Sequence, residues 1–254
     1  MDVQGRCESD GLRRRGEDGM TRGGSMLAII TARGGSKRIP RKNVKAFMGK
    51  PMIAYAIAAA KGSGLFDEVM VSTDDAEIAE IAKANGAAVP FLRSAATAND
   101  FATTNDVLKE VLAEYAKLGR TFDAFCCIYP CVPFLTGELL KEAGKTFAAS
   151  GARGLVPVVR YSYPIQRALV RDAAGFISFR EPENAAKRSQ DLEPTFHDAG
   201  MFYFSTAAAF AEDGGIPREG LSMFELPEER VQDIDTEADW QMAEMKYKMM
   251  ETAK

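Results

Sequence analysis

Histidine is almost absent from this sequence of 254 residues, which contains His197 alone. Cysteine is also scarce: there are four, and Cys126, Cys127 and Cys131 share one apolar stretch. A tetrahedral zinc site needs four nitrogen or sulfur ligands, and this small set gives it little support. Adjacent side chains on a strand point to opposite faces, which disfavours a disulfide between Cys126 and Cys127. We expect small buried thiols in a reducing compartment.

Long apolar runs and a strong net charge are missing too. No stretch approaches the roughly 20 apolar residues that span a bilayer. The formal net charge is −4, so any positive site has to be assembled locally. Apolar residues make up 46% of the chain, enough for the core of one large α/β domain or a domain with a small subdomain. We therefore expect a cytoplasmic protein with no nucleic acid and no membrane among its partners.

Residues 1–25 show no hydrophobic period and are rich in glycine and charge, which predicts a disordered N-terminal extension. Three arginines at positions 13–15 resemble the start of a twin-arginine export signal, but no apolar segment follows them. Export is therefore disfavoured. The folded domain is expected to begin at Met26 and to occupy residues 26–254.

Short apolar runs alternate with helical patterns up to about residue 160. The apolar runs, predicted as buried strands, are residues 26–31, 68–72, 88–91, 124–129 and 155–159. The helical patterns, several with cap signals, are residues 51–62, 76–86, 103–118 and 136–149. This order predicts an α/β fold with a doubly wound, mainly parallel sheet and right-handed crossovers. Ligands bind such a sheet at the carboxyl ends of its strands.

The pattern changes after residue 160. Residues 160–200 hold short strand-like pieces, prolines and many polar groups, which predicts a small inserted subdomain that covers the site or meets a partner subunit. Residues 201–204 return as a strand. A last helix at residues 237–249 carries an apolar stripe that includes Trp240, Met242 and Met245, and this stripe is predicted to pack on the core.

Cations are dense directly after the first predicted strand. The seven within residues 33–50 are Arg33, Lys37, Arg38, Arg41, Lys42, Lys45 and Lys50. Gly34 and Gly35 let backbone amides approach a ligand closely. A strand, a glycine turn and a helix in this order form a phosphate cradle, and cations there would neutralise a triphosphate. The alternative is a solvated basic loop. The segment matches neither GxxxxGK[ST] nor GxGxxG, so a P-loop ATPase and a dinucleotide-binding oxidoreductase are poorly supported.

An acid pair lies near the other end of the chain, in the extended segment VQDID. Alternation along extended backbone places Asp233 and Asp235 on one face. Two hard oxygen ligands on one face suit Mg²⁺, which keeps waters and takes phosphate oxygens as further ligands. A surface pair of acids is the alternative, and the basic loop upstream favours the metal site.

The loop ARGGSKRIPRKN at residues 32–43 resembles the signature loop of the CMP-sialic acid synthetase family of cytidylyltransferases. Further segments similar to that family follow in order, at residues 49–57, 71–82, 90–93, 128–135 and 231–240. The resemblance extends from residue 26 to about residue 247. It implies a Rossmann-like, GT-A-like nucleotidyltransferase fold and a homodimer.

Three segments are most similar to the pseudaminic acid branch of the family: SYPIQRAL, RSQDLE and FHDAGMFY. Met201 and the element Tyr129-Pro130-Cys131 depart from the usual family residues. The resemblance implies transfer of CMP from CTP to the anomeric hydroxyl of a nonulosonic acid, with pseudaminic acid the first choice. Legionaminic acid, N-acetylneuraminic acid and Kdo are alternatives. A nucleotidyltransferase for another base or a sugar 1-phosphate, and a non-catalytic nucleotide-binding domain, are rival classes that the acid pair and cations disfavour.

The resemblance also assigns individual residues. The residues implied as catalytic are Arg33, Lys42, Asp233 and Asp235, and the two aspartates would bind Mg²⁺. The residues implied to hold CTP are Arg33, Gly34, Gly35, Ser36, Lys37, Asn43, Arg93 and Asp100. The residues implied to meet the sugar acid are Gln166, Arg167, Arg188 and His197, with an arginine expected at the sugar carboxylate. His197 could instead be a structural residue bonded to Asp198, so both roles stay open.

Overall fold

The structure, a computed structural model, describes residues 24–252. Most of the extension predicted at residues 1–25 lies outside the described residues, as does Cys7. Ser25 lies within them, and its backbone N–H donates to the Asp123 carboxylate at 2.7 Å. The described fold therefore begins before Met26, with a contact that fixes the start of the first strand.

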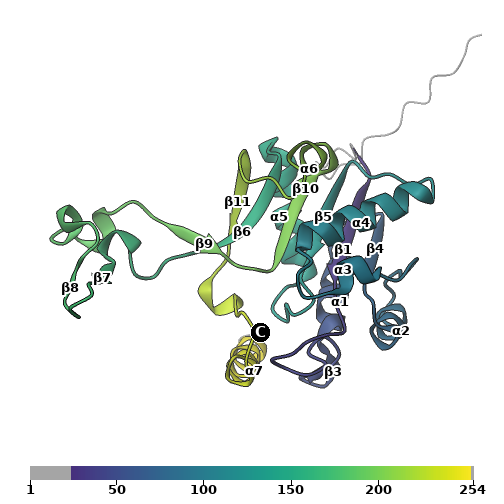
Figure 1. Cartoon of the computed structure of the whole chain (residues 1–254), viewed down its shortest axis with the longest axis horizontal. Coiled ribbons are helices and arrows are strands. Elements are labelled where there is room, and N and C mark those ends of the chain that lie inside the picture. Colours follow the sequence, from purple (N-terminus) through teal and green to yellow (C-terminus); the bar gives the residue numbers. More distant parts are fainter. Residues whose placement is uncertain (1–23, 253–254) are drawn as a thin grey trace, which may run out of the picture.

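Seven strands form one sheet in the order β11-β6-β10-β5-β1-β4, with β9 also paired to β6 (Figure 1). Their bounds are β1 (Met26–Thr31), β4 (Glu68–Ser72), β5 (Ala124–Ile128), β6 (Gly154–Arg160), β9 (Phe196–Asp198), β10 (Phe202–Thr206) and β11 (Leu221–Glu225). β1 is parallel to β4 and β5, and β6 is parallel to β11. β10 is antiparallel to both β5 and β6, and β9 is antiparallel to β6. The predicted α/β fold with a mainly parallel sheet is confirmed, with two antiparallel strands added.

Helices cover both faces of this sheet. Their bounds are α1 (Met52–Ser63), α2 (Ala76–Ala84), α3 (Ala95–Ala98), α4 (Thr104–Lys117), α5 (Gly137–Ser150), α6 (Ala207–Asp213) and α7 (Glu237–Thr252). α1 and α5 approach so closely that a Cβ on Gly137 would lie 2.6 Å from the carbonyl carbon of Gly62. No helix within residues 24–252 has the length and apolarity needed to cross a bilayer.

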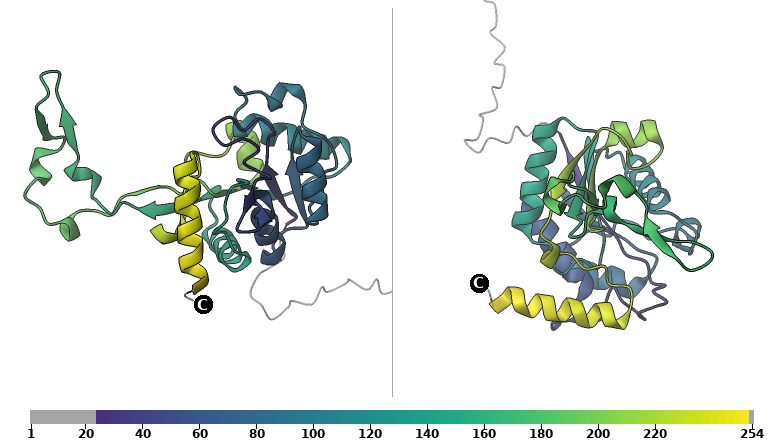
Figure 2. Two further views of the ribbon diagram at one scale, coloured as in Figure 1. Left: turned by 90° about the horizontal axis from the view of Figure 1, so that it is seen from below. Right: turned by 90° about the vertical axis from the view of Figure 1, so that its left-hand side faces the viewer.

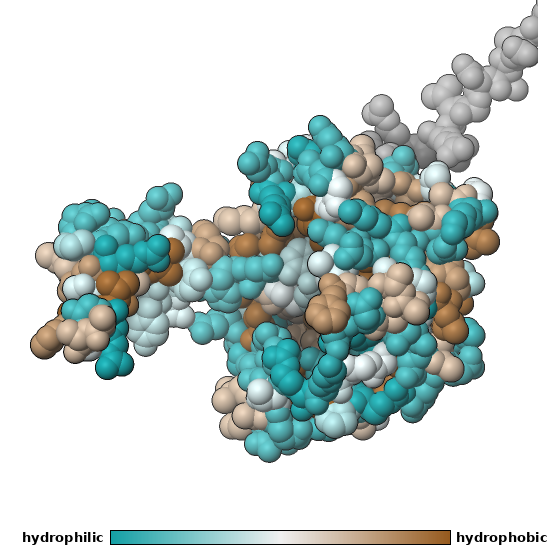
Figure 3. All heavy atoms as spheres, viewed as in Figure 1, coloured by the Kyte–Doolittle hydropathy of each residue, from teal (hydrophilic) through white to brown (hydrophobic). Residues whose placement is uncertain are grey.

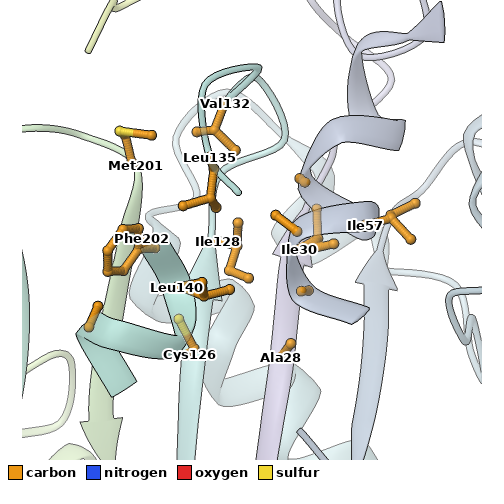
Figure 4. Close-up of a cluster of buried hydrophobic side chains, with 14 of the residues drawn as sticks. Ala28, Ile30, Ile57, Cys126, Ile128, Val132, Leu135, Leu140, Met201 and Phe202 are labelled. Carbon is orange, nitrogen blue, oxygen red and sulfur yellow. The ribbon is translucent and has the colours of Figure 1, made fainter. Parts of the chain in front are cut away.

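The side chains on the two faces of β1 pack into two separate hydrophobic cores, as expected from the period of two along a strand. Ala28 and Ile30 pack with α1, α2 and α5, in the cluster drawn in Figure 4. Leu27 and Ile29 pack with α4 and α6 on the other face. The same alternation separates the adjacent cysteines, since Cys126 belongs to the first cluster and Cys127 to the second. Both thiols are free and buried, as predicted.

Several predicted elements differ from the structure. The strand predicted at residues 88–91 is reduced to one bridge between Ala88 and Met70. β11 and the short helices α3 and α6 were not predicted. The two helices are too short to show a clear period, and β11 lacks the buried apolar run that marks the other strands. α7 forms and buries Trp240, but Met242 and Met245 are 47% and 59% exposed, so the predicted core stripe is only partly buried.

An arm of residues 161–195 projects from the body (Figures 1 and 2). It contains the hairpin β7 (Leu169–Arg171) and β8 (Ile177–Phe179) and three short 3-10 helices, η1 (Ile165–Arg167), η2 (Pro182–Asn184) and η3 (Ser189–Asp191). Most of its residues are exposed, although Asn184 and Leu192 are buried. The arm falls within residues 160–200, where an inserted segment was expected, whereas β9 from the same range joins the main sheet.

Candidate active site

A cleft of about 280 Å³ opens at the carboxyl ends of β1 and β5, the edge where α/β sheets bind ligands. Thr31 ends β1 and Tyr129 follows β5, and both line the cleft. The other lining residues come from the basic loop, from residues 93–107, from Pro130 and from Asp235. On the face seen in Figure 3, the body is hollowed, and most of the side chains around the hollow are hydrophilic.

The basic loop connects β1 to α1 and contains the small pair β2 (Ala46–Phe47) and β3 (Lys50–Pro51). Asn43 fixes its shape from inside: this side chain is 5% exposed and donates to the Arg33 carbonyl at 2.9 Å. Gly34 packs against α2, because a Cβ there would lie 2.8 Å from the Asp75 carboxylate. The Gly34 amide donates to the Asp74 carboxylate at 3.0 Å. At Gly35, by contrast, an added Cβ would meet no atom within 4 Å.

The loop cations divide into two groups. Those that line the cleft are Arg33, Lys37, Arg38 and Lys42. Arg41 points instead to the start of α2, where it pairs with Asp75 and Glu77. The Arg41 guanidinium lowers the pKa of Asp75 to about 2, and Asp75 also caps α2 by accepting from the Ile78 amide. Four of the seven cations therefore face the cleft, and Arg41 has a structural task.

The four cleft cations are shared between two carboxylates. Arg33 and Lys37 both pair with Asp100, Arg33 at 2.9 Å. Arg38 and Lys42 pair with Asp235, at 2.9 and 3.4 Å. The pairs with Asp100 are largely exposed, so water and salt weaken them. An incoming polyphosphate can therefore compete for the two cations that pair with Asp100.

The segment that carries the acid pair meets the basic loop through Asp235 and the Ile234 carbonyl. Ile234, which lies between Asp233 and Asp235, is buried in the core. Because side chains alternate along extended backbone, the two carboxylates point away from that core. Lys42 donates to the Ile234 carbonyl at 2.6 Å, which ties the loop to this segment. Arg33 and Asp235 thus line one cleft, as the phosphate and metal hypothesis required.

Helix α7 holds the acid pair in place. Trp240 and Tyr247 pack edge-to-face on Phe47, at ring distances of 5.4 and 5.6 Å. Lys45 lies 4.4 Å from the centre of the Trp240 ring and pairs with Glu237. The basic loop and the segment that follows the acid pair therefore share one small core.

Mg²⁺ at the acid pair stays a prediction, because Asp235 lines the cleft whereas Asp233 does not. Within residues 24–252, no group of three or more acidic, cysteine or histidine side chains is arranged to hold a metal. Asp233 and Asp235 would need phosphate and water oxygens as further ligands, which is the coordination that Mg²⁺ favours. Cys131 lies beside them, but burial raises the pKa of its thiol to about 12, so it is a poor metal ligand.

The opposite wall of the cleft comes from residues 93–104. Arg93 is mostly buried, and its guanidinium donates to the Ser72 hydroxyl and carbonyl at 3.1 and 2.7 Å. Burial lowers the pKa of Arg93. Sequence reasoning found Arg93 but missed Thr97, Asn99 and Tyr129, which also line the cleft. For these three residues composition and spacing give no distinctive signal, because the small polar composition of residues 94–104 is typical of any loop.

The four residues expected to meet the sugar acid do not line this cleft. Gln166 and Arg167 are in η1 on the arm, and Arg188 precedes η3. His197 is in β9, and its Nδ1 lies 3.0 Å from the Asp198 carbonyl. The Asp198 carboxylate instead accepts from the Tyr203 hydroxyl at 2.8 Å. Within one chain, the structure separates these residues from the phosphate loop.

Comparison with known proteins agrees with this geometry. A family model described as cytidylyltransferase matches residues 27–211. The chain belongs to the cytidylyltransferase family. Among curated cytidylyltransferases, it is 40% identical over 223 residues to the pseudaminic acid cytidylyltransferase of Campylobacter jejuni, covering 88% of this chain and 96% of that relative. It is 33% identical over 235 residues to the CMP-N,N'-diacetyllegionaminic acid synthase of Legionella pneumophila, covering 89% of this chain and 96% of the relative.

Solved structures support the same fold. A CMP:2-keto-3-deoxy-manno-octonic acid synthetase complexed with CTP superimposes with a TM-score of 0.64 at 18% identity, over 90% of this chain and 99% of that one. A 4-diphosphocytidyl-2C-methyl-D-erythritol synthase from Anaerococcus prevotii gives 0.58 at 13% identity, over 88% and 98%. At these identities the likeness concerns the fold of a cytidylyltransferase alone.

Proposed function

We propose that this chain transfers the cytidylyl group of CTP to the anomeric hydroxyl of pseudaminic acid and releases pyrophosphate. The observation that carries the proposal is the meeting of Lys42 and Asp235, 193 residues apart in sequence, in one cleft lined by cations. The 40% identity to a pseudaminic acid cytidylyltransferase over 88% of the chain supports the choice of sugar.

In the proposed reaction, the anomeric oxygen attacks the α-phosphorus of CTP. A new oxygen–phosphorus bond forms as the bond to the bridging oxygen of pyrophosphate breaks, and the hydroxyl proton is lost. Negative charge grows on the phosphate oxygens, which cations arranged in advance stabilise. That Arg33, Lys37, Arg38 and Lys42 line the cleft supports this role for them.

Mg²⁺ is the cofactor that we propose, with Asp233 and Asp235 as its protein ligands. When bound, it would neutralise phosphate charge and help to orient the triphosphate. Lys42 donates to the backbone between these two residues, so it would hold the acid pair beside the phosphates whatever its own contact with them. The free thiols also suit the cytoplasm, where we propose that the enzyme acts.

A substrate panel tests the proposed activity. Purified protein is assayed with CTP, Mg²⁺ and one of four acids: pseudaminic acid, N,N'-diacetyllegionaminic acid, N-acetylneuraminic acid and Kdo. We expect pyrophosphate release with the highest kcat/KM for pseudaminic acid. UTP and ATP serve as nucleotide controls. A higher kcat/KM for another acid would overturn the choice of sugar, and no release with any acid would overturn the activity.

We further propose that the chain works as a homodimer joined through the arm. The arm exposes large apolar side chains, with Tyr163 88%, Phe176 74% and Ile177 67% exposed. Apolar side chains gathered on a thin projection are typical of a surface that a partner covers. A second copy is the partner that the resemblance implies. Light scattering at several concentrations measures the mass in solution.

The arm also carries the candidate for the sugar carboxylate. We expect Arg188→Ala to raise the KM for the sugar acid at least about tenfold while the KM for CTP changes less than about twofold, because a guanidinium pairs specifically with carboxylate. Arg171→Ala, also exposed on the arm, is the matched control. Equal rises in both KM values would contradict the assignment. In a dimer whose arm serves the partner's cleft, an equal mixture of Arg188→Ala and Asp235→Asn chains, assayed well below the KM for the sugar acid, should recover about a quarter of wild-type activity.

The direction in which the Kd for CTP changes when the Asp100 carboxylate is removed distinguishes two roles for this residue. It pairs with Arg33 and Lys37, so its carboxylate competes with phosphates for these cations. We expect Asp100→Asn to lower the Kd for CTP about two- to fivefold at low salt, and less at high salt. Calorimetry at two salt concentrations measures this, with Glu114→Gln as a control outside the cleft. Weaker binding would instead favour a direct contact between Asp100 and the nucleotide, as the resemblance implies.

A further inference from the structure

Glu110 gathers an unusual number of hydrogen bonds for a residue that does not line the cleft. It projects from α4, and its carboxylate accepts from the Ser94 amide at 2.7 Å, from the Ser94 hydroxyl at 3.1 Å and from the Thr97 hydroxyl. Burial opposes its ionisation, yet these donors and the charge of Arg93 lower the pKa of Glu110. Glu110 is therefore ionised in the folded protein at neutral pH.

The segment that Glu110 holds has little else to support it. α3 is four residues long, has no buried residues and has no side-chain cap. The Ser94 hydroxyl, which is in the N-cap position, donates to Glu110 instead of accepting from the helix. A short, exposed, uncapped helix has low local stability, so tethers to neighbouring elements decide where it lies.

This segment supplies one wall of the cleft. Arg93 and Thr97 line the cleft on either side of Ser94, which does not. On one side, β4 fixes residue 93, because the Arg93 amide donates to the Thr73 carbonyl at 2.8 Å and its guanidinium donates to Ser72. On the other side, Glu110 fixes residues 94 and 97. Residues 93–97 are thus clamped between the end of β4 and α4.

We propose that Glu110 is a positioning residue for nucleotide binding, which holds Ser94 and Thr97 in place at the wall of the cleft, next to Arg93. This inference rests on the proposed function, since it takes CTP as the ligand of the cleft. Glu110 acts through the wall and not by contact with the nucleotide. Its loss should therefore weaken CTP binding and leave both the sugar and the chemical step nearly unchanged.

Three variants separate the parts of this role. We expect Glu110→Ala to raise the Kd and the KM for CTP about tenfold, with kcat and the sugar KM changed less than about threefold. Glu110→Gln keeps an acceptor for the Ser94 amide and can bond both hydroxyls. Its Kd for CTP should therefore stay within about threefold of the wild-type value. Ser94→Ala combined with Glu110→Ala should raise the Kd for CTP no more than Glu110→Ala alone does, because both changes remove the same tether.

The control is Glu114→Ala, one turn further along α4, whose carboxylate pairs with Lys117. It should leave the Kd for CTP unchanged. Hydrogen exchange gives a second measurement: Glu110→Ala should speed exchange in residues 94–103, and Glu114→Ala should not. Unchanged CTP binding in Glu110→Ala, or multiplying effects of Ser94→Ala and Glu110→Ala, would overturn the proposal. CTP binding is measured without sugar, so a wild-type protein that binds CTP but turns over no acid would refute the proposed function and not this role.

Discussion

Replacing Asp235 by asparagine is expected to lower kcat at least about 100-fold, the range seen when one electrostatic contact to a transition state is lost. Asparagine has nearly the same shape but is neutral. It would weaken the hold on Mg²⁺ and remove the charge opposite Arg38 and Lys42, which lie 2.9 and 3.4 Å from the carboxylate. The fold should survive, because the side chain is partly exposed at the edge of the cleft.

The measurement is pyrophosphate release as a function of Mg²⁺ concentration. Asp235→Asn should need more Mg²⁺ for half of its maximal rate, as well as turning over slowly. Asp213→Asn is the control, because that carboxylate pairs with Arg153 and does not line the cleft. Wild-type turnover in Asp235→Asn would show that the acid pair is not the metal site, and the proposed mechanism would then fail.

Much of the central sheet could be predicted because its signals are local. β1, β4, β5 and β6 are apolar runs bounded by loop residues, and each was predicted to within a few residues. β10 was predicted as a strand, but its direction was not. Its neighbours β5 and β6 run parallel to each other, and β10 lies between them in the opposite sense. Strand direction depends on pairings made far along the chain, which no local pattern contains.

The candidate site shows the same division between local and distant information. The basic loop and the acid pair were found from composition and spacing, and their convergence follows from the rule that ligands bind at the carboxyl ends of parallel strands. The carboxylate that holds Arg33 and Lys37 was named only by the family resemblance, because Asp100 is in a loop with no periodic signal. The projection of the arm away from the cleft could not be predicted from the sequence pattern either. A change of pattern after residue 160 marks an insertion but gives no direction.

Each cleft cation is paired with a carboxylate, and this explains how an acidic chain maintains a phosphate site. Asp100 and Asp235 hold four cations close together that would otherwise repel one another. Phosphates can take over the cations of Asp100, whose pairs are exposed to solvent. Asp235 differs, since its segment is tied to the loop by the Lys42 bond to the Ile234 carbonyl. We therefore expect the Asp100 pairs to be replaced by phosphate contacts when a nucleotide binds, and the link between Lys42 and the Asp235 segment to persist.

This difference predicts a large effect for Lys42→Met. Methionine keeps the apolar stem but loses the ammonium that bonds the Ile234 carbonyl at 2.6 Å and lies 3.4 Å from Asp235. We expect kcat/KM for CTP to fall about 100-fold, since both a phosphate contact and the tie to the acid pair are lost. Lys50→Met is the matched control, because Lys50 lies in β3 over the Tyr55 ring and outside the cleft.

A double-mutant cycle then tests whether loop and acid pair act as one unit. If Lys42 supports turnover by holding Asp235 beside the phosphates, the kcat of Lys42→Met combined with Asp235→Asn should be within about threefold of the kcat of Asp235→Asn alone. Effects that multiply would mean that the two residues act independently, and Lys42 would then be a phosphate contact only. Calorimetry with CTP in the absence of Mg²⁺ adds a second criterion. Lys42→Met should weaken binding there, while Asp235→Asn should not, because only the lysine can attract phosphate without the metal.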